Sequence, residues 1–239
     1  MVVAMIRILL ACFSLAAFAA PAAAAERRYS VSDYDRVLVE GPYRVRLVTG
    51  RPSSAVASGS REALDRIDVD VQGQTLRIRR NRAAWGGTPG AQAGPVTIEL
   101  ATRNVRAIRL VGPASLEADG VEGLNVHLTV EGSGSLRALN VAADNLAVSL
   151  MGSGRLDVAG TAIQLRIVSQ GTGDIAASGL RAENGTVNTN SSGAVSVEVV
   201  RAATVTADGL GEVEILGRPA CTVRGLGASQ VRCGLSDQR

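Results

Sequence analysis

A glycine-cornered motif recurs along the second half of this chain at nearly constant spacing. The first three copies read Gly-Pro-Ala-Ser-Leu, Gly-Ser-Gly-Ser-Leu and Gly-Ser-Gly-Arg-Leu. Gly-Thr-Gly-Asp-Ile and Ser-Ser-Gly-Ala-Val follow, and two looser copies close the series. The copies begin at residues 112, 132, 152, 171, 191, 209 and 225. A fixed period in this range is typical of stacked-repeat architectures.

Each repeat is predicted to fold as strand, corner and strand. Aliphatic residues alternate with other residues on both sides of the glycines, and this period of two indicates β-strands. The first glycine supplies a backbone shape that a Cβ would forbid, and the second allows a tight return. A single unit cannot bury its apolar face, whereas stacked units bury columns of aliphatic side chains. We therefore expect an all-β, single-stranded parallel β-solenoid (β-helix-like) with Leu136, Leu156 and Ile175 in one column. A Greek-key sandwich is the alternative.

Composition agrees with a thin aliphatic core, because aromatic residues make up only 3% of the chain. The sequence contains no lysine, so all 25 basic residues are arginines, and lysine-based covalent or base catalysis is excluded. The formal net charge is only +3, which together with the export signal described next argues against nucleic acid as a partner.

The N-terminus is predicted to be a secretion signal spanning residues 1–25. Arg7 supplies the positive region, residues 8–20 the apolar region, and the alanines at 22–25 a cleavage site. This segment is too short to span a membrane comfortably. Lipidation at Cys12 is an alternative, since the residues before it weakly match a lipoprotein cleavage box. We expect an exported protein, periplasmic or secreted, with no transmembrane segment in the mature chain.

Cys221 and Cys233 remain after removal of the signal. In an oxidising compartment such a pair is expected to form a disulfide, which here would pin the last coil and contribute about 2–4 kcal/mol. Without a neighbouring histidine the two cysteines make a poor zinc site. No metal and no cofactor is expected.

A β-hairpin is predicted in the N-terminal half, where residues 67–72 and 75–79 form its two strands. Its Gly73-Gln74 turn suits a type II′ geometry and places Asp70 opposite Arg77 and Asp68 opposite Arg79. Other expectations are strands on both sides of a Gly41-Pro42 turn, a helical turn at 61–66 and a loop at 81–95. The expected organisation is N-terminal strands and hairpins over 26–111, solenoid repeats over 112–234 and a polar tail over 235–239.

Several of these segments together resemble a known family. They are Tyr34-Asp35-Arg36-Val37-x-Val39-x-Gly41-Pro42-Tyr43-x-Val45-x-Leu47-x-x-Gly50, then Gly73-Gln74-Thr75-Leu76-x-Ile78, then Ile108-x-Leu110-x-Gly112 before the repeats. This order resembles the putative auto-transporter adhesin head domain called the GIN domain, a family of unknown function, over roughly residues 31–234. The resemblance implies a parallel β-solenoid and an adhesin-like role, and it supplies no active-site residues.

Candidate ligand contacts are few. An arginine cluster could bind phosphate or sulfate groups on envelope polymers, although a solvated surface is the plainer interpretation. The cluster comprises Arg77, Arg79, Arg80, Arg82, Arg44 and Arg46. Trp85, in the loop, could stack on a sugar ring or anchor the loop instead.

Other residues offer weaker chemistry. His127 is the only histidine and is predicted to point outward as an ordinary surface residue. Asp174 weakly matches a calcium-binding turn. Pairs of acids could support glycoside hydrolysis, but the repeats show no ladder of acids. The acids are Asp33, Asp35, Glu40, Asp208 and Glu212.

The favoured hypothesis is a non-catalytic exported β-solenoid of the bacterial cell envelope that binds or scaffolds a glycan or a protein. A carbohydrate-active enzyme on the same scaffold is the second hypothesis. A self-associating structural protein is the third, because open strand edges invite pairing. The sequence leaves the oligomeric state and the ligand open.

Overall fold

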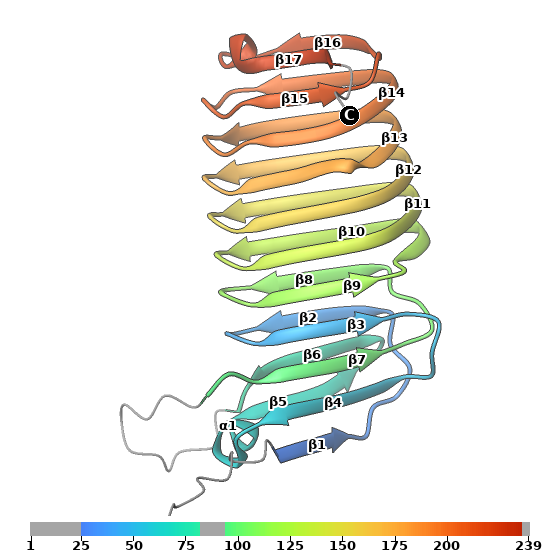
Figure 1. The fold of residues 1–239 in the computed structure, drawn as a ribbon, viewed down its shortest axis with the longest axis vertical. Coiled ribbons are helices and arrows are strands. Elements are labelled where there is room, and N and C mark those ends of the chain that lie inside the picture. Colours follow the sequence, from blue (N-terminus) through green and yellow to red (C-terminus); the bar gives the residue numbers. More distant parts are fainter. Residues whose placement is uncertain (1–24, 82–93, 236–239) are drawn as a thin grey trace, which may run out of the picture.

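The computed structural model describes residues 25–81 and 94–235. The chain winds into a tall stack of coils, and each coil contributes a strand to each of two facing walls (Figure 1). The wall whose strands run into the glycine corners is called the pre-corner wall. The wall whose strands leave these corners is called the post-corner wall. The predicted secretion signal, Cys12, Arg82 and Trp85 lie outside the described residues.

Five parallel strands form the middle of the stack. They are β10 (Glu122–Gly132), β11 (Ser135–Gly152), β12 (Arg155–Gly171), β13 (Asp174–Ser191) and β14 (Val195–Ala207). Leu136 pairs with Leu156, and Leu156 pairs with Ile175, so the predicted column exists. From β11 to β14 each strand continues around the bend opposite the corner, from the post-corner wall to the pre-corner wall (Figure 1). The predicted parallel β-solenoid is confirmed, and the sandwich alternative is wrong.

The corner glycines lie where neighbouring coils approach each other most closely. Gly132, Gly152 and Gly171 have φ angles of 104°, 124° and 113°, which only glycine adopts readily. At the second glycine of each corner the requirement is space. A Cβ placed on Gly193 would lie 2.0 Å from the carbonyl oxygen of Gly173 in the preceding coil. The motif therefore serves the stacking of the coils as well as the turn.

The predicted hairpin is present as β5 (Ile67–Gln72) and β6 (Thr75–Arg80), with Asp68 opposite Arg79. Gly73 has a φ of 63°, as a type II′ turn requires. The predicted helical turn is α1 (Arg61–Asp65), which begins after Ser60 because the Ser60 hydroxyl accepts a hydrogen bond from the Ala63 N–H at 3.1 Å.

One coil is inserted out of sequence order. It consists of β2 (Arg36–Glu40) and β3 (Arg44–Val48). Strand β2 lies in parallel between β6 and β8 (Ala107–Val111), while β3 lies between β7 (Thr97–Ala101) and β9 (Ser115–Asp119). Gly41, with a φ of 123°, therefore acts as a further corner of the solenoid, and its N–H donates to the Val111 carbonyl at 3.2 Å.

The two ends of the stack differ. At the N-terminal end, β1 (Ala25–Tyr29) pairs antiparallel with β4 (Ser54–Gly59), which pairs antiparallel with β7. Sequence analysis did not predict β1 or β4. The C-terminal end consists of β15 (Val213–Leu216), β16 (Ala220–Arg224), the 3₁₀ turn η1 (Ala228–Gln230) and β17 (Val231–Leu235). These strands continue the parallel pairing of β14.

Candidate functional site

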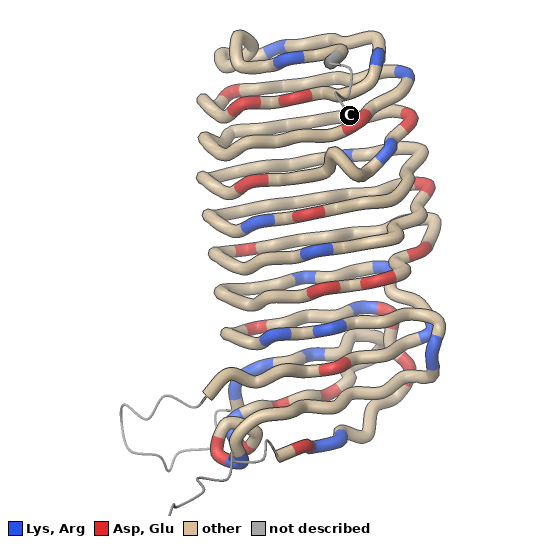
Figure 2. The backbone as a smooth tube through the Cα atoms, in the orientation of Figure 1, with Lys and Arg blue, Asp and Glu red and all other residues tan. Residues whose placement is uncertain are grey.

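Charges of opposite sign alternate along the post-corner wall. One outward row runs through paired positions on consecutive strands: Glu99, Arg46, Glu117, Arg137 and Asp157. Arg46 Nε lies 3.6 Å from Glu117 Oε2, and both side chains are more than 60% exposed. Figure 2 shows blue and red segments following one another up this wall. Arg46 therefore belongs to a mixed-sign row and not to a cluster of arginines.

A hollow of about 600 Å³ opens on this wall where two serines follow each other. Ser115 and Ser135 are paired neighbours on β9 and β11, and Arg44 on β3 continues the same row. Short serine side chains between long ones leave the surface hollowed. We call this site the serine hollow. It is lined by Arg44, Val45, Arg46, Thr97, Ser115, Leu116, Glu117, Ser135, Leu136, Arg137 and Asp157.

The two acids of the serine hollow already have arginine partners. Glu117 is paired with Arg46, and Asp157 Oδ1 lies 3.4 Å from Arg155 Nε. In contrast, no described carboxylate forms an ion pair with Arg44 or with Arg137, although Arg137 lies in register between two acids. Two arginines thus remain available to a ligand. Sequence analysis named Arg44 but missed Arg137. An alignment of the repeats on their glycines would have placed Arg137 beside Glu117.

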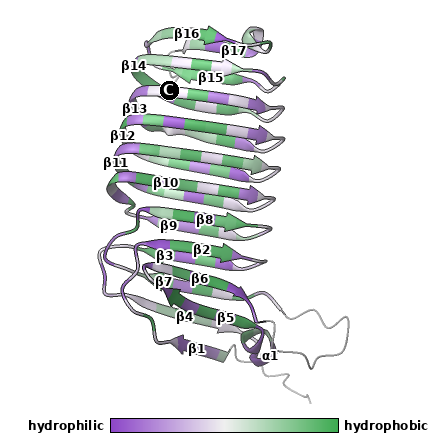
Figure 3. Cartoon of the chain, turned by 180° about the vertical axis from the view of Figure 1, so that it is seen from behind, coloured by the Kyte–Doolittle hydropathy of each residue, from purple (hydrophilic) through white to green (hydrophobic). Residues whose placement is uncertain are grey.

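Amides and hydroxyls cover the middle of the pre-corner wall. Asn125, Asn145, Gln164 and Asn184 pair on successive strands, and Asn145 Nδ2 donates to Asn125 Oδ1 at 3.1 Å. A second outward row contains Thr129, Ser149, Val168, Asn188 and Thr206. Over residues 145–151, 164–170 and 184–190 the only charged residue is Arg166. Figure 3, seen from behind relative to Figure 1, shows hydrophobic and hydrophilic bands alternating along these strands.

The structure separates the arginines that the sequence suggested as a cluster. Arg77 and Arg79 lie on β6 in the pre-corner wall, whereas Arg44 and Arg46 lie on β3 in the post-corner wall. Buried aliphatic residues alternate with the arginines on both strands, so the two pairs point away from each other. Arg44 and Arg46 therefore do not share a face with Arg77 and Arg79, because β2 and β3 turn a corner between the walls.

Arg77 and Arg79 are engaged within the hairpin. Arg79 Nε and Nη2 donate to Asp68 Oδ2 at 3.1 and 2.9 Å, and this hydrogen-bonded carboxylate raises the pKa of Arg79. Arg77 donates to Gln72 Oε1 at 2.7 Å, whereas Asp70, its opposite neighbour, approaches Arg79 instead at 3.6 Å. Their use as ligand contacts stays a prediction.

The weaker candidates, His127 and Asp174, lie on the surface of the repeats. His127 is exposed, in register between Ala107 and Ala147. Asp174 Oδ1 accepts a hydrogen bond from the Ala194 N–H at 2.9 Å, so this carboxylate tethers the next coil. Over residues 25–81 and 94–235, no group of three or more His, Cys, Asp or Glu side chains could hold a metal ion.

Cys221 and Cys233 form a disulfide at the C-terminal end of the stack. Their Cα atoms are 6.6 Å apart, within the range that a disulfide spans. The bond joins β16 of the pre-corner wall to β17 of the post-corner wall. It thereby ties together the two strands of the last coil.

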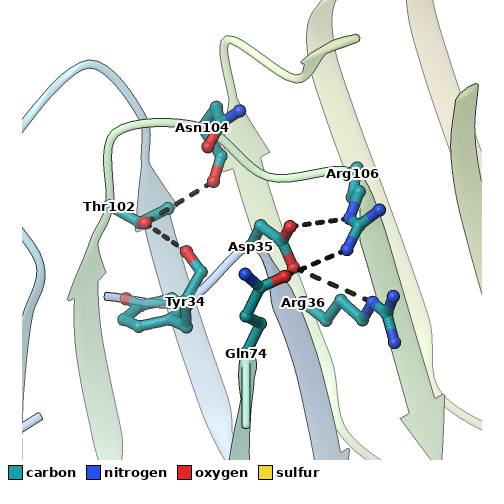
Figure 4. Close-up of polar contacts among 7 residues, drawn as sticks. All are labelled: Tyr34, Asp35, Arg36, Gln74, Thr102, Asn104 and Arg106. Carbon is teal, nitrogen blue, oxygen red and sulfur yellow. Dashed lines mark hydrogen bonds and ion pairs between the residues drawn. The ribbon is translucent and has the colours of Figure 1, made fainter. Parts of the chain in front are cut away.

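A polar cluster holds the inserted coil in place (Figure 4). The Asp35 carboxylate pairs with Arg106, and Arg106 Nη2 also donates to Gln74 Oε1 at 3.1 Å. Beside it, the Thr102 hydroxyl donates to the Tyr34 carbonyl at 2.6 Å. Two other acids proposed from sequence are also ion-paired, Asp33 with Arg103 and Glu212 with Arg232.

These features define an elongated single-stranded parallel β-solenoid with alternating charges on its post-corner wall and mostly amides and hydroxyls across the middle of its pre-corner wall. Residues 33–219 match the family described as "Putative auto-transporter adhesin, head GIN domain", and the chain belongs to this family. A search of curated proteins found no match. Among the described residues, no helix is both long enough and apolar enough to cross a membrane.

Solved structures share the fold. A protein titled putative adhesin from Bacteroides fragilis superposes with a TM-score of 0.77 at 18% identity, covering 86% of this chain and 95% of that one. A protein from Parabacteroides distasonis titled putative lipid binding protein gives a TM-score of 0.66 at 19% identity, covering 88% and 96%. Another putative adhesin from Parabacteroides distasonis gives 0.62 at 18%, covering 89% and 96%. At these identities the likeness concerns the fold.

Proposed function

We propose that this protein is a non-catalytic binding module of adhesin type, exported to the bacterial cell envelope. Its pre-corner wall is the main contact surface, and its partner is an envelope glycan or protein. The observation that carries the proposal is the run of amide and hydroxyl side chains across β10 to β14. Within residues 145–151, 164–170 and 184–190 of this run, Arg166 is the one charged residue.

Such a wall suits a partner rich in hydroxyl or amide groups. Asn and Gln side chains each donate and accept hydrogen bonds, and Ser and Thr hydroxyls do the same. Uncharged polar groups cost less to remove from water than charges do. Equivalent side chains recur about every 4.8 Å from strand to strand, so several weak contacts with one polymeric ligand add up. The strands are fixed in a hydrogen-bonded stack, so little conformational entropy is lost on binding.

Names of related proteins support the same role. The family carries an adhesin description, and two of the structural neighbours are titled putative adhesins. Export is proposed on the predicted signal in residues 1–25, and the Cys221–Cys233 disulfide is in keeping with an oxidising compartment. The non-catalytic part of the proposal rests on the two acids that line the serine hollow, since Glu117 and Asp157 are each engaged by an arginine.

The test is a glycan array and an envelope-fraction pull-down with the wild type and a double variant, Ser149→Arg/Asn188→Arg. These two positions lie in the second outward row of the pre-corner wall, and bulky charged side chains there would block the wall without touching the core. The expected result is binding by the wild type and a loss of at least tenfold in the double variant, with an unchanged melting temperature.

Ser196→Arg is the matched control, because Ser196 lies outward on the post-corner wall of β14. It should bind as the wild type does. Equal binding by all three proteins would contradict the proposal. Release of reducing ends from a bound glycan would instead establish the enzyme alternative. A molecular mass that rises with concentration would establish self-association.

A further inference from the structure

We propose that the serine hollow on the post-corner wall is a second binding site, and that it takes an acidic glycan carrying carboxylate or sulfate groups at intervals along its chain. This site faces away from the surface proposed above and does not depend on it. The argument rests on three observations: unpaired arginines, a polar hollow of suitable size, and the spacing of charges along the wall.

The first observation concerns the ion pairs around the hollow. Both acids that line it are within ion-pair distance of an arginine, Glu117 of Arg46 and Asp157 of Arg155. Among the described residues, Arg44 and Arg137 have no carboxylate at such a distance. A guanidinium group presents five N–H donors in a planar fork that matches carboxylate and sulfate oxygens. Two such forks at one hollow are therefore free to receive anionic groups.

The second observation is the chemistry of the lining between these arginines. Ser115 and Ser135 follow Arg44 in one row along the stack, and Thr97 precedes it. Three hydroxyls thus offer hydrogen bonds to the hydroxyls of a sugar ring. The volume of about 600 Å³ lies in the range of pockets that hold small molecules.

The third observation is the spacing of positive charge. The two unpaired arginines, Arg44 on β3 and Arg137 on β11, are on strands two steps apart, with β9 between them. Two interstrand steps amount to about 10 Å. A polysaccharide with one acidic group per disaccharide has charges at a comparable interval. Glu117 and Asp157 would repel a polymer that is charged at every unit, and DNA carries one charge per about 1.7 Å. The row therefore favours a sparsely charged glycan.

The test uses isothermal titration calorimetry with four probes of similar length. The two acidic glycans are a hyaluronan octasaccharide, which has one carboxylate per disaccharide, and an oligogalacturonate octamer, which has one carboxylate per sugar. The other two probes are neutral maltooctaose and a short DNA duplex. The wild type should bind the hyaluronan probe best, bind maltooctaose at least tenfold more weakly, and lose affinity as salt increases. Arg44→Gln/Arg137→Gln should weaken hyaluronan binding at least tenfold, since charge-assisted hydrogen bonds are lost.

Arg166→Gln is the control, because it removes one positive charge by the same substitution from the opposite wall. Its hyaluronan affinity should equal that of the wild type. Three results would overturn the proposal: no binding of hyaluronan by the wild type, equal binding by the double arginine variant, or tighter binding of DNA. The Ser149→Arg/Asn188→Arg variant should keep hyaluronan binding, so the two proposals fail independently.

Discussion

Asp35 Oδ2 lies 2.7 Å from Arg106 Nε, and this pair joins two coils that are far apart in the sequence. Asp35 immediately precedes β2, and Arg106 immediately precedes β8. Their backbones are also joined, since the Arg106 N–H donates to the Asp35 carbonyl at 2.8 Å. On its other side the Asp35 N–H donates to the carbonyl of Gln74, which precedes β6. Asp35 thus aligns three neighbouring coils at one edge of the pre-corner wall.

The Asp35–Arg106 pair is predicted to stabilise the fold measurably. The Asp35 side chain is 20% exposed, so the pair is less screened by water than an ordinary surface pair. A double-mutant cycle with Asp35→Ala and Arg106→Ala, read by urea unfolding, should give a coupling energy of about 1 kcal/mol or more. The Asp33–Arg103 pair is the control. At 3.8 Å and more than two-thirds exposed on both sides, it should give a coupling near zero. Equal coupling in both cycles would contradict this prediction.

Gly193→Ala is predicted to destabilise the protein by about 1–3 kcal/mol or more. The added Cβ would lie 2.0 Å from the Gly173 carbonyl oxygen, and backbone atoms can yield only if two coils separate. The melting temperature should fall accordingly. Gly123→Ala is the matched control, because its Cβ would meet only Val126 Cγ2, at 3.7 Å. It should change the unfolding free energy by no more than about 0.5 kcal/mol.

The repeats could be predicted from sequence because each one carries its own local evidence. Glycines need particular backbone angles and close approaches, and aliphatic alternation fixes which side chains face the core. Since consecutive repeats stack on each other, sequence order and spatial order agree from β8 onward. The column through Leu136 and Leu156, and the hairpin pairing of Asp68 with Arg79, followed from period and turn chemistry alone.

The inserted coil could not be predicted in this way. The Gly41-Pro42 corner resembles the Gly112-Pro113 corner, but no local pattern states that β2 and β3 enter the stack between strands that come later in the chain. The position of Arg44 follows from this insertion, because it sets Arg44 beside Ser115 and two strands from Arg137. The serine hollow therefore depends on long-range topology, which also places Arg44 and Arg46 on the wall opposite Arg77 and Arg79.

Thr189→Val is predicted to stabilise the protein by about 1 kcal/mol. Thr189 is buried, and no residue in the described ranges forms a hydrogen bond with its hydroxyl. Valine keeps the shape and removes the unsatisfied group. Thr102→Val is the counterpart, because the buried Thr102 hydroxyl donates to the Tyr34 carbonyl at 2.6 Å. That substitution should cost about 1–3 kcal/mol. Urea unfolding of both variants checks the pair, and a loss of stability in Thr189→Val would contradict the first expectation.

Stability is predicted to fall at alkaline pH, chiefly through Tyr34. Burial raises the pKa of Tyr34 above that of a free tyrosine, because the interior disfavours the phenolate. The folded protein therefore holds this proton more tightly than the unfolded chain does. The resulting stability is complete below about pH 10 and is lost as the pH rises further. Burial acts on Tyr43 in the same direction.

The Tyr34→Phe variant tests this assignment. The chain contains no lysine, so tyrosines dominate its titration in this range of pH. At pH 7 the variant should be less stable by about 1 kcal/mol, since the Tyr34 hydroxyl donates to the Ala101 carbonyl at 2.7 Å. Between about pH 10 and 12 its unfolding free energy should decline less steeply than that of the wild type. Parallel declines in urea unfolding across this range would show that another group controls the alkaline loss. A Tyr34→Phe/Tyr43→Phe variant should be flatter still, because both raised pKa values are then removed.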